Sequence, residues 1–326
     1  VRDAHGVRPL CIGWVDEVSN ADVHSEPENV VATAGRVAIS SETCALYDMG
    51  YTIDTVPVAN VMQCKFGAHG IVCSRHTHAS SRVPAAQHCL FESIYFANAT
   101  SILDGSDTAV FRRACGAQLW EDDMPTQQHA FLTSHTIVCG SPNSGLAAAR
   151  GYARRSGLPY AQVLIKNPSY TKQRTFILQT NCERKEACRQ KFMIAPMLRR
   201  TLCGALVVLV DDSIVRGNTM SAIVSMFFDG GAREVHVRVA SPPVQDTCRK
   251  GIDIPTSKEL LAVQVHNEQL ADDKQVPKQE HTNVQTGVQQ RIHATSVRYL
   301  THEHMCTLHV LSGGSGEICT ACFGCG

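Results

Sequence analysis

The apolar run at residues 205–210, Ala-Leu-Val-Val-Leu-Val, constrains the fold more than any other stretch of the sequence. A run of this length without polar alternation is typical of a strand that is buried on both faces of a parallel sheet. Turn residues follow it, and residues 221–232 then read as a helix that ends at a pair of glycines. Residues 234–241 alternate as another strand and stop before Pro242. This strand–helix–strand order predicts an α/β domain with a central parallel sheet.

The same alternation begins further upstream in the chain. Residues 137–145 are an apolar run ending in turn residues, 146–157 read as a helix rich in Ala and Arg, and 160–165 read as a strand. By contrast, residues 1–80 hold short strand-like pieces separated by turn residues, so we expect a β-rich region there. Residues 263–292 are polar and rich in Gln, which predicts a surface loop.

Composition excludes several classes of protein. The chain carries 30 Lys+Arg and 30 Asp+Glu, so no net field points to nucleic acid or a membrane surface as a partner. No apolar run reaches the roughly 18 residues of a spanning helix, and the first ten residues lack the apolar core of a secretory signal. An odd count of 15 cysteines argues against a disulfide framework and for a reducing compartment, which we expect to be the cytoplasm.

Two adjacent carboxylates, Asp211 and Asp212, directly follow the apolar strand, at the sheet edge where open α/β sheets bind ligands. A short loop and a helix start come next, formed by Ser213, Ile214, Val215, Arg216, Gly217, Asn218 and Thr219. Free N–H groups at a helix start hold a phosphate, which two carboxylates would repel. The acids therefore face either sugar hydroxyls or a Mg²⁺ that bridges to further phosphates. The expected ligand is a phosphorylated sugar with a metal-bound diphosphate. If the acidic pair is considered alone, without the loop after it, the alternative is that the two residues form a solvent-exposed turn with no ligand.

A second group of candidate ligands lies at the carboxyl end of the chain. Cys319, Cys322 and Cys325 are each separated by two residues, a spacing that suits a metal or an iron–sulfur centre. A zinc site is the alternative for the tail pair, Cys319 and Cys322. The remaining cysteines are expected to be small buried residues of the packing.

These stretches, taken together, resemble the glutamine phosphoribosylpyrophosphate amidotransferases. The stretch from Val207 to Thr219 and the one from 231 to 243 resemble that family's site for 5-phosphoribosyl-1-diphosphate (PRPP). Further matches follow in the family's order, at 2–13, 37–46, 88–105, 141–160, 163–167, 174–177, 251–262 and 319–323. The resemblance covers most of the chain and implies a type I phosphoribosyltransferase domain around the parallel sheet.

The resemblance assigns roles to residues of the expected sugar-phosphate site. Asp211 and Asp212 match the acidic pair that contacts the ribose hydroxyls and Mg²⁺, and Ser144 matches a serine of the same metal site. Residues 213–219 match the loop around the 5-phosphate. Lys166 and Arg174 match basic residues of a lid over the diphosphate, where they would stabilise the charge that develops as the diphosphate leaves. The implied activity is transfer of ammonia to PRPP, giving 5-phosphoribosylamine and diphosphate in the first step of purine biosynthesis.

The resemblance also divides the cysteines. Cys89, Cys248, Cys319 and Cys322 match the four thiolates that hold a [4Fe–4S] cluster in one branch of the family, where the cluster is structural. The implied domains are the carboxyl-side part of a β-rich, amino-terminal-nucleophile glutaminase domain (1–80), the transferase domain (81–262), and a polar linker with a cysteine-containing tail that packs on the transferase domain (263–326). Feedback by purine nucleotides and a homo-oligomer are further implications of the family.

Three departures from the family pattern shape the expected activity. The chain begins at Val1, without the amino-terminal cysteine that the family uses to hydrolyse glutamine, so glutaminase activity is not expected from it. The lid stretch at 166–177 is two residues longer than the family's, lacks its glycine and carries a proline after Asn167. The linker is more polar than the family's. Enzyme, non-catalytic PRPP-binding regulator and inactive fragment therefore stand as the competing hypotheses.

Overall fold

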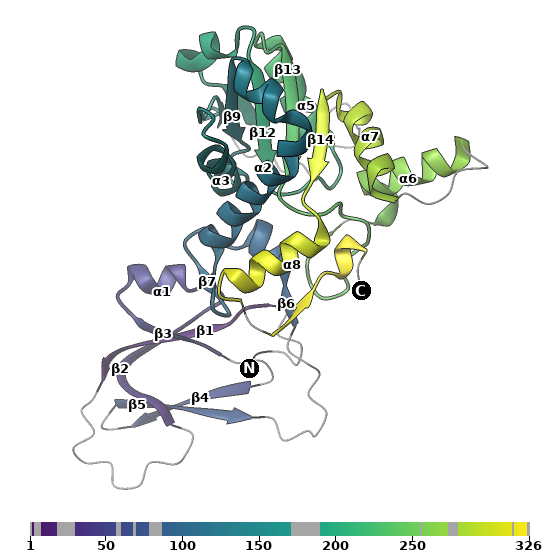
Figure 1. Ribbon diagram of the computed structural model, residues 1–326. Helices are drawn as coiled ribbons and strands as arrows, with labels where there is room; N and C mark the ends of the chain where they lie inside the picture. Colours follow the sequence, from purple (N-terminus) through teal and green to yellow (C-terminus); the bar gives the residue numbers. More distant parts are fainter. Residues whose placement is uncertain are drawn as a thin grey trace. The chain divides into compact units, whose positions relative to one another are not determined.

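The computed structural model describes residues 2, 8–17, 30–56, 60–67, 70–77, 87–170, 190–254, 256–272, 280–314 and 316–324. The chain divides into two compact units. One contains residues 1–111 and 309–320, and the other contains residues 112–308 and 321–326 (Figure 1).

The first unit is built on a five-stranded antiparallel sheet with the strand order β3-β1-β2-β5-β4. Its strands are β1 (Cys11–Glu17), β2 (Val30–Ser40), β3 (Thr52–Thr55), β4 (Asn60–Gly67) and β5 (Gly70–Thr77). The short helix α1 (Cys44–Asp48) connects β2 to β3. Buried side chains that include Ile12 and Trp14 form a small apolar cluster on the sheet. The expected β-rich region is confirmed.

The rest of the first unit brings together two segments that are far apart in the sequence. Strand β6 (Gln87–Cys89) pairs in parallel with β15 (Glu317–Cys319). The π-helix η1 (Glu92–Phe96) and the two-residue strands β7 (Ile102–Leu103) and β8 (Ser106–Asp107) follow β6. The carboxyl-terminal part of the chain therefore contributes a strand to this unit.

The second unit contains the expected parallel sheet. Its four strands are ordered β14-β13-β12-β9, and all neighbouring pairs are parallel. They are β9 (Thr136–Gly140), β12 (Leu206–Asp211), β13 (Glu234–Val239) and β14 (Ser296–Tyr299). Every residue of β12 is buried, because neighbouring strands and helices cover this central strand on both faces. The α/β prediction is confirmed.

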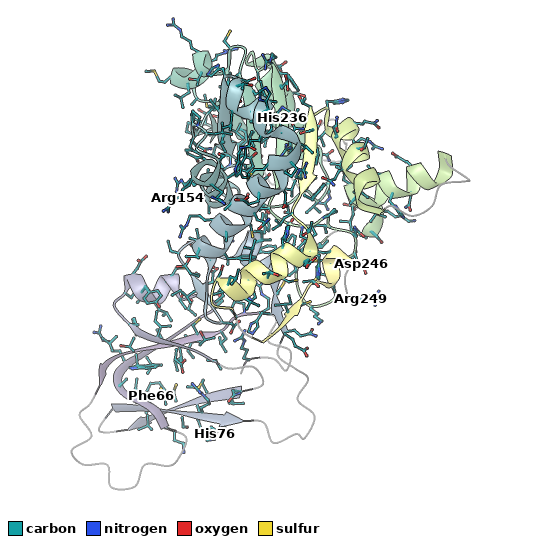
Figure 2. The ribbon with its side chains drawn as sticks, viewed as in Figure 1. Phe66, His76, Arg154, His236, Asp246 and Arg249 are labelled. Atoms are coloured by element: carbon teal, nitrogen blue, oxygen red, sulfur yellow. The ribbon has the colours of Figure 1, made fainter. Side chains whose placement is uncertain are left out.

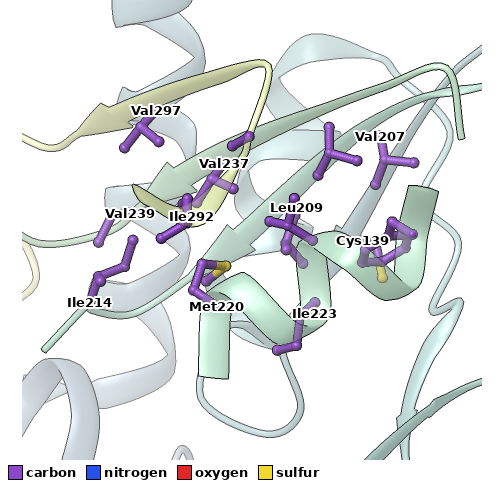
Figure 3. Close-up of a cluster of buried hydrophobic side chains, with 14 of the residues drawn as sticks. Cys139, Val207, Leu209, Ile214, Met220, Ile223, Val237, Val239, Ile292 and Val297 are labelled. Atoms are coloured by element: carbon purple, nitrogen blue, oxygen red, sulfur yellow. The ribbon is translucent and has the colours of Figure 1, made fainter. Parts of the chain in front are cut away.

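Helices pack on both faces of this sheet. On one face, α5 (Asn218–Asp229) and α7 (Glu280–Ile292) contribute Ile223 and Ile292 to an apolar core that also contains Leu209 and Val237 (Figure 3). On the other face, Asp123 of α2 (Thr108–Thr133) accepts hydrogen bonds from Arg238 of β13 and from Tyr152 of α3 (Leu146–Ser156). The expected helices after β9 and β12 are thus both present.

Two local expectations differ from the structure. Residues 263–292 are not a loop where they are described, because α6 (Leu261–Asp272) and α7 occupy most of them. Their few apolar residues recur at helical spacing, and Val284, Val288 and Ile292 are buried in the core. The strand expected at 160–165 is confined to β10 (Leu164–Lys166), which pairs with β11 (Phe192–Ile194) outside the parallel sheet.

The remaining elements are short apart from one helix. They are the 3₁₀ helices η3 (Pro196–Leu202), η4 (Ser257–Glu259) and η5 (Ala321–Phe323) and the helix α8 (His302–Leu311). Among the described residues, no helix combines the length and the apolar character that a membrane crossing requires.

Candidate active site

The carboxyl edge of the parallel sheet carries the residues that the sequence singles out. Asp211 is the last residue of β12, and the loop after β9 reaches it through a hydrogen bond from the Ser141 N–H to the Val210 carbonyl at 2.9 Å. On the other side, the Ala240 N–H donates to the Asp211 carbonyl at 2.9 Å. The loops after three neighbouring strands therefore converge at the edge where such sheets bind ligands.

The acidic pair is built into a compact hydrogen-bonded group. The Ser144 hydroxyl donates to Asp211 Oδ1 at 3.1 Å, and the Asp212 N–H donates to the same oxygen at 2.9 Å. The Ser213 hydroxyl donates to Asp212 Oδ2 at 2.6 Å. Both carboxylates are buried, with 8% of Asp211 and 3% of Asp212 exposed. The structure thus joins Ser144 to the acidic pair, which only the family resemblance had suggested.

The electrostatics of the pair favour a bound cation. Burial raises the pKa of Asp211 well above its ordinary value, and the neighbouring Asp212 carboxylate raises it further. No lysine, arginine or histidine of the described residues forms an ion pair with either carboxylate. Two buried like charges without a counter-charge are unfavourable, and oxygen ligands of this kind suit Mg²⁺. The residues present therefore fit a magnesium site.

The loop after the acidic pair is held by a distant segment. Gly217 adopts a φ of 77° just before α5, and a Cβ there would lie 2.5 Å from a side-chain carbon of Leu261. The Leu261 N–H donates to the Val215 carbonyl at 2.8 Å, and Arg216 Nε donates to Glu259 Oε2 at 2.7 Å. Arg216 is thus already paired, so its cation does not reach toward the carboxylates.

The start of α5 is the part of this loop with the chemistry to hold an anion. The first N–H groups of any helix lack partners within the helix, and the helix dipole adds a positive potential there. Asn218 and Thr219 begin α5 and are half-buried, whereas the Ile214 side chain is buried in the apolar core. Ile214 therefore anchors the loop, and only its backbone can contact a ligand.

Of the two basic residues assigned to the lid, the structure describes only Lys166 and does not join it to this site. Lys166 ends β10 and is exposed, and no hydrogen bond or ion pair joins it to the acidic pair within the described part of the chain. Arg174 lies outside the described residues. Their roles stay predictions.

The four candidate cluster ligands fall into two pairs. Cys89 and Cys319 are directly opposite each other where β6 pairs with β15, and burial raises the pKa of Cys89 to about 11. Cys322 belongs to the second unit, where its carbonyl accepts hydrogen bonds from the N–H groups of Gln245 and Asp246. Cys248 follows two residues later, on the loop that Figure 2 marks with Asp246 and Arg249.

The iron–sulfur prediction is neither confirmed nor contradicted by these positions. Among the described residues, no group of three or more His, Cys, Asp or Glu side chains could hold a metal ion. Cys325, the third cysteine of the tail, lies outside the described residues. The four-cysteine set stays a prediction.

The sequence patterns do not predict two residues of the site. Gly145 allows the loop after β9 to touch β12, because a Cβ there would lie 2.2 Å from the Val210 carbonyl oxygen. Glu259 pairs with Arg216 across 43 positions of sequence. The position of Gly145 directly after Ser144 is a local signal of this close approach. No local sequence pattern predicts that Glu259 pairs with Arg216.

Replacement of Gly145 by Ala should disturb the site through this close contact. The added methyl group forces β12 and the loop apart, and we expect a loss of about 1–3 kcal/mol in the free energy of unfolding. Chemical denaturation measures it. Gly157→Ala is the control, because a Cβ there meets nothing within 4 Å and only its φ of 74° is strained. Equal losses in the two variants would contradict the contact.

Known proteins similar to the chain were found by sequence. The chain is 37% identical over 273 residues to the amidophosphoribosyltransferase of Drosophila melanogaster, covering 83% of this chain and 46% of that protein. It is 35% identical over 323 residues to the amidophosphoribosyltransferase of Archaeoglobus fulgidus, covering 98% of this chain and 58% of that protein. No protein-family model matches the chain.

Solved structures agree with the sequence matches. The glutamine phosphoribosylpyrophosphate amidotransferase from B. subtilis, complexed with ADP and GMP, matches with a TM-score of 0.70 and 30% identity over 98% of this chain and 59% of that one. A structure described as the allosteric regulatory enzyme of purine biosynthesis matches with a TM-score of 0.67 and 30% identity, covering 98% of this chain and 58% of that one. The chain is therefore a homologue of the amidophosphoribosyltransferases, and it spans about half the length of the curated relatives it matches.

Proposed function

We propose that this chain carries the phosphoribosyltransferase part of an amidophosphoribosyltransferase and transfers ammonia to PRPP, giving 5-phosphoribosylamine and diphosphate. This reaction is the first step of purine biosynthesis. The observation that carries the proposal is the buried group of Asp211, Asp212 and Ser144 beside the start of α5. The carboxylates of this group and the start of α5, which can bind an anion, lie close enough to contact the same ligand.

The two parts of the site serve opposite ends of PRPP. The N–H groups at the start of α5 and the Thr219 hydroxyl bind the 5-phosphate. The Ser213 hydroxyl joins them when it turns from Asp212 Oδ2 toward the ligand. Asp211 and Asp212 accept hydrogen bonds from the ribose hydroxyls, and with Ser144 they would hold Mg²⁺. When bound, Mg²⁺ supplies positive charge that offsets the charge of the diphosphate.

The lid residues complete the proposed chemistry. Lys166 and Arg174 contact the diphosphate and stabilise the negative charge that it gains as its bond to C1 of the ribose breaks. Closure of the lid excludes water from C1, so that ammonia attacks instead. The ammonia comes from glutamine in the full family, and we propose a cytoplasmic homo-oligomer that purine nucleotides inhibit. The complex of the B. subtilis protein with ADP and GMP supports the nucleotide part of this proposal.

Release of diphosphate from PRPP tests the proposed reaction. We expect release that requires both an ammonium salt and Mg²⁺, and we expect PRPP with Mg²⁺ to stabilise the chain by about 3 kcal/mol at 100-fold excess over its dissociation constant. Stabilisation without diphosphate release would favour the alternative, a non-catalytic PRPP-binding regulator. The longer lid at 166–177 is the observation that favours this alternative.

We further propose that Cys89, Cys248, Cys319 and Cys322 hold a structural [4Fe–4S] cluster. The pairing of Cys89 with Cys319 and the fold of Cys322 onto the loop that precedes Cys248 support it. Thiolate ligands suit iron–sulfur clusters, and binding would require deprotonation of a Cys89 thiol whose pKa burial raises to about 11.

A change of Cys319 to Ser should therefore remove the cluster. We expect anaerobically purified chain to be brown and to contain iron and sulfide, and the Cys319→Ser variant to be colourless. Cys44→Ser is the control, since Cys44 is half-buried in α1 and should leave the iron content unchanged. Zinc without iron in the parent chain would contradict the cluster and favour a zinc site.

A further inference from the structure

Two cysteines outside the proposed sites face each other in the first unit. Cys64 of β4 and Cys73 of β5 are directly opposite in the antiparallel ladder, and their sulfur atoms are 3.2 Å apart. Figure 2 shows the two strands with the labels Phe66 and His76. Side chains of directly opposite residues lie on the same face of a sheet, so both thiols point to the same side.

The two thiols differ in their access to solvent. Cys64 is half-buried and Cys73 is fully buried, with 0% exposed, in the apolar cluster that includes Ile12 and Trp14. A reagent in solution therefore reaches Cys64 first. Burial and the hydrogen bond with Cys64 raise the pKa of Cys73 to about 12, so Cys73 stays a thiol until its neighbour reacts.

We propose that Cys64 and Cys73 form a reversible intramolecular disulfide when the chain meets a low-molecular-weight disulfide. A disulfide needs sulfur atoms about 2.05 Å apart, so these sulfurs must approach by only about 1 Å, within reach of side-chain rotation. This inference does not depend on the proposed function.

The reaction balances as two thiol–disulfide exchanges. The Cys64 thiolate attacks one sulfur of the small disulfide, whose sulfur–sulfur bond breaks and releases one thiol. Cys73 then attacks the Cys64 sulfur, its proton passes to the departing thiolate, and the second thiol is released. The two cysteines are oxidised by two electrons, and the small disulfide is reduced to two thiols.

The product would lock an edge of the sheet. β4 is the outermost strand beside β5 in the five-stranded order, so among the described residues its backbone is held by β5 and, at its first residue, by one hydrogen bond from the Arg2 N–H to the Asn60 carbonyl at 3.0 Å. An edge strand held from one side is prone to fraying and to pairing with other chains. A covalent link at the Cys64–Cys73 pair would hold β4 in its register under oxidising conditions.

Treatment with glutathione disulfide, followed by alkylation and peptide mapping by mass spectrometry, tests the proposal. We expect a Cys64–Cys73 cross-link with a mass loss of about 2 Da, reversed by dithiothreitol. Cys203 serves as an internal control, because it is exposed and should carry a stable glutathione adduct. Cys44→Ser should leave the cross-link unchanged.

Two variants separate the two steps. In Cys73→Ala, Cys64 should accumulate a glutathione adduct, because the resolving thiol is gone. In Cys64→Ala, Cys73 should stay unmodified, because reagents do not reach it. An adduct that accumulates on Cys64 in the parent chain, or a cross-link from Cys64 to another cysteine, would overturn the proposal.

Discussion

An Asp211→Asn variant is expected to bind PRPP about 100-fold more weakly in the presence of Mg²⁺, and to be more stable than the parent chain when both ligands are absent. Isothermal titration measures the affinity, and chemical denaturation in a chelator measures the stability. The weaker binding follows from the loss of a carboxylate that contacts both the ribose and the metal. Ammonia-dependent release of diphosphate should fall with it.

The gain in stability follows from the raised pKa of Asp211. An acid whose pKa is raised by folding binds its proton more tightly in the folded chain, so its ionisation opposes folding. The loss of folding stability caused by ionising Asp211 is absent below its ordinary pKa of 3.8. It grows as the pH rises toward and through the pKa of Asp211 in the folded chain. At neutral pH, Asp211→Asn should therefore raise the free energy of unfolding by on the order of 1 kcal/mol. This gain should shrink as the pH falls toward 3.8.

The matched control is Asp253→Asn, which removes an exposed carboxylate of the same unit. It should change neither PRPP affinity nor stability beyond about 0.5 kcal/mol. PRPP affinity that Asp211→Asn leaves unchanged would contradict the assigned role of the acidic pair. A variant that loses both affinity and stability would instead show that Asp211 is a structural residue.

The strand–loop–helix core of the site could be predicted because each of its signals is local. The apolar run of β12, the acidic pair and the glycine before α5 follow one another within 14 residues, and each has a direct structural meaning. The partners of this stretch come from elsewhere in the chain. Glu259, Gly145 and Leu261 contact it through tertiary packing, which neither periodicity nor spacing encodes.

The helices that were missed share one physical cause. α6 and α7 are mostly polar, so their composition suggested a loop, yet a few apolar residues at helical spacing suffice to dock them on the core. The long helix α2 was not anticipated and contains Pro125, a residue that usually ends helices. In both cases burial of one face outweighs the local preferences.

Arg238 of β13 lies at the centre of a buried ionic network, and its replacement should strongly destabilise the fold. It is 1% exposed, and its Nε donates to Asp123 of α2, which is 0% exposed. Tyr152 Oη donates to the same carboxylate at 2.7 Å, and Arg298 Nε lies 2.9 Å from its other oxygen. The network therefore ties α2 and α3 to β13 and β14 on one face of the sheet.

Arg238→Met should cost about 3–5 kcal/mol of unfolding free energy, because it leaves the buried Asp123 carboxylate without its main counter-charge. Adding Asp123→Asn should restore about half of that loss, since the amide removes the buried charge and still accepts from Tyr152. Arg233→Met is the control: its side chain is 56% exposed, and a change of at most about 0.5 kcal/mol is expected. Urea denaturation of the four chains provides these values.

The network also bears on the active site through the register of the sheet. Arg238 pairs with Val210 in the ladder, one position before Asp211. Loosening β13 should therefore weaken Mg²⁺-dependent PRPP binding in Arg238→Met, and Asp123→Asn should restore binding along with stability. Binding that stays weak in the double variant while stability recovers would show that Arg238 acts on the site by its charge. Equal stability of Arg238→Met and the parent chain would contradict the network itself.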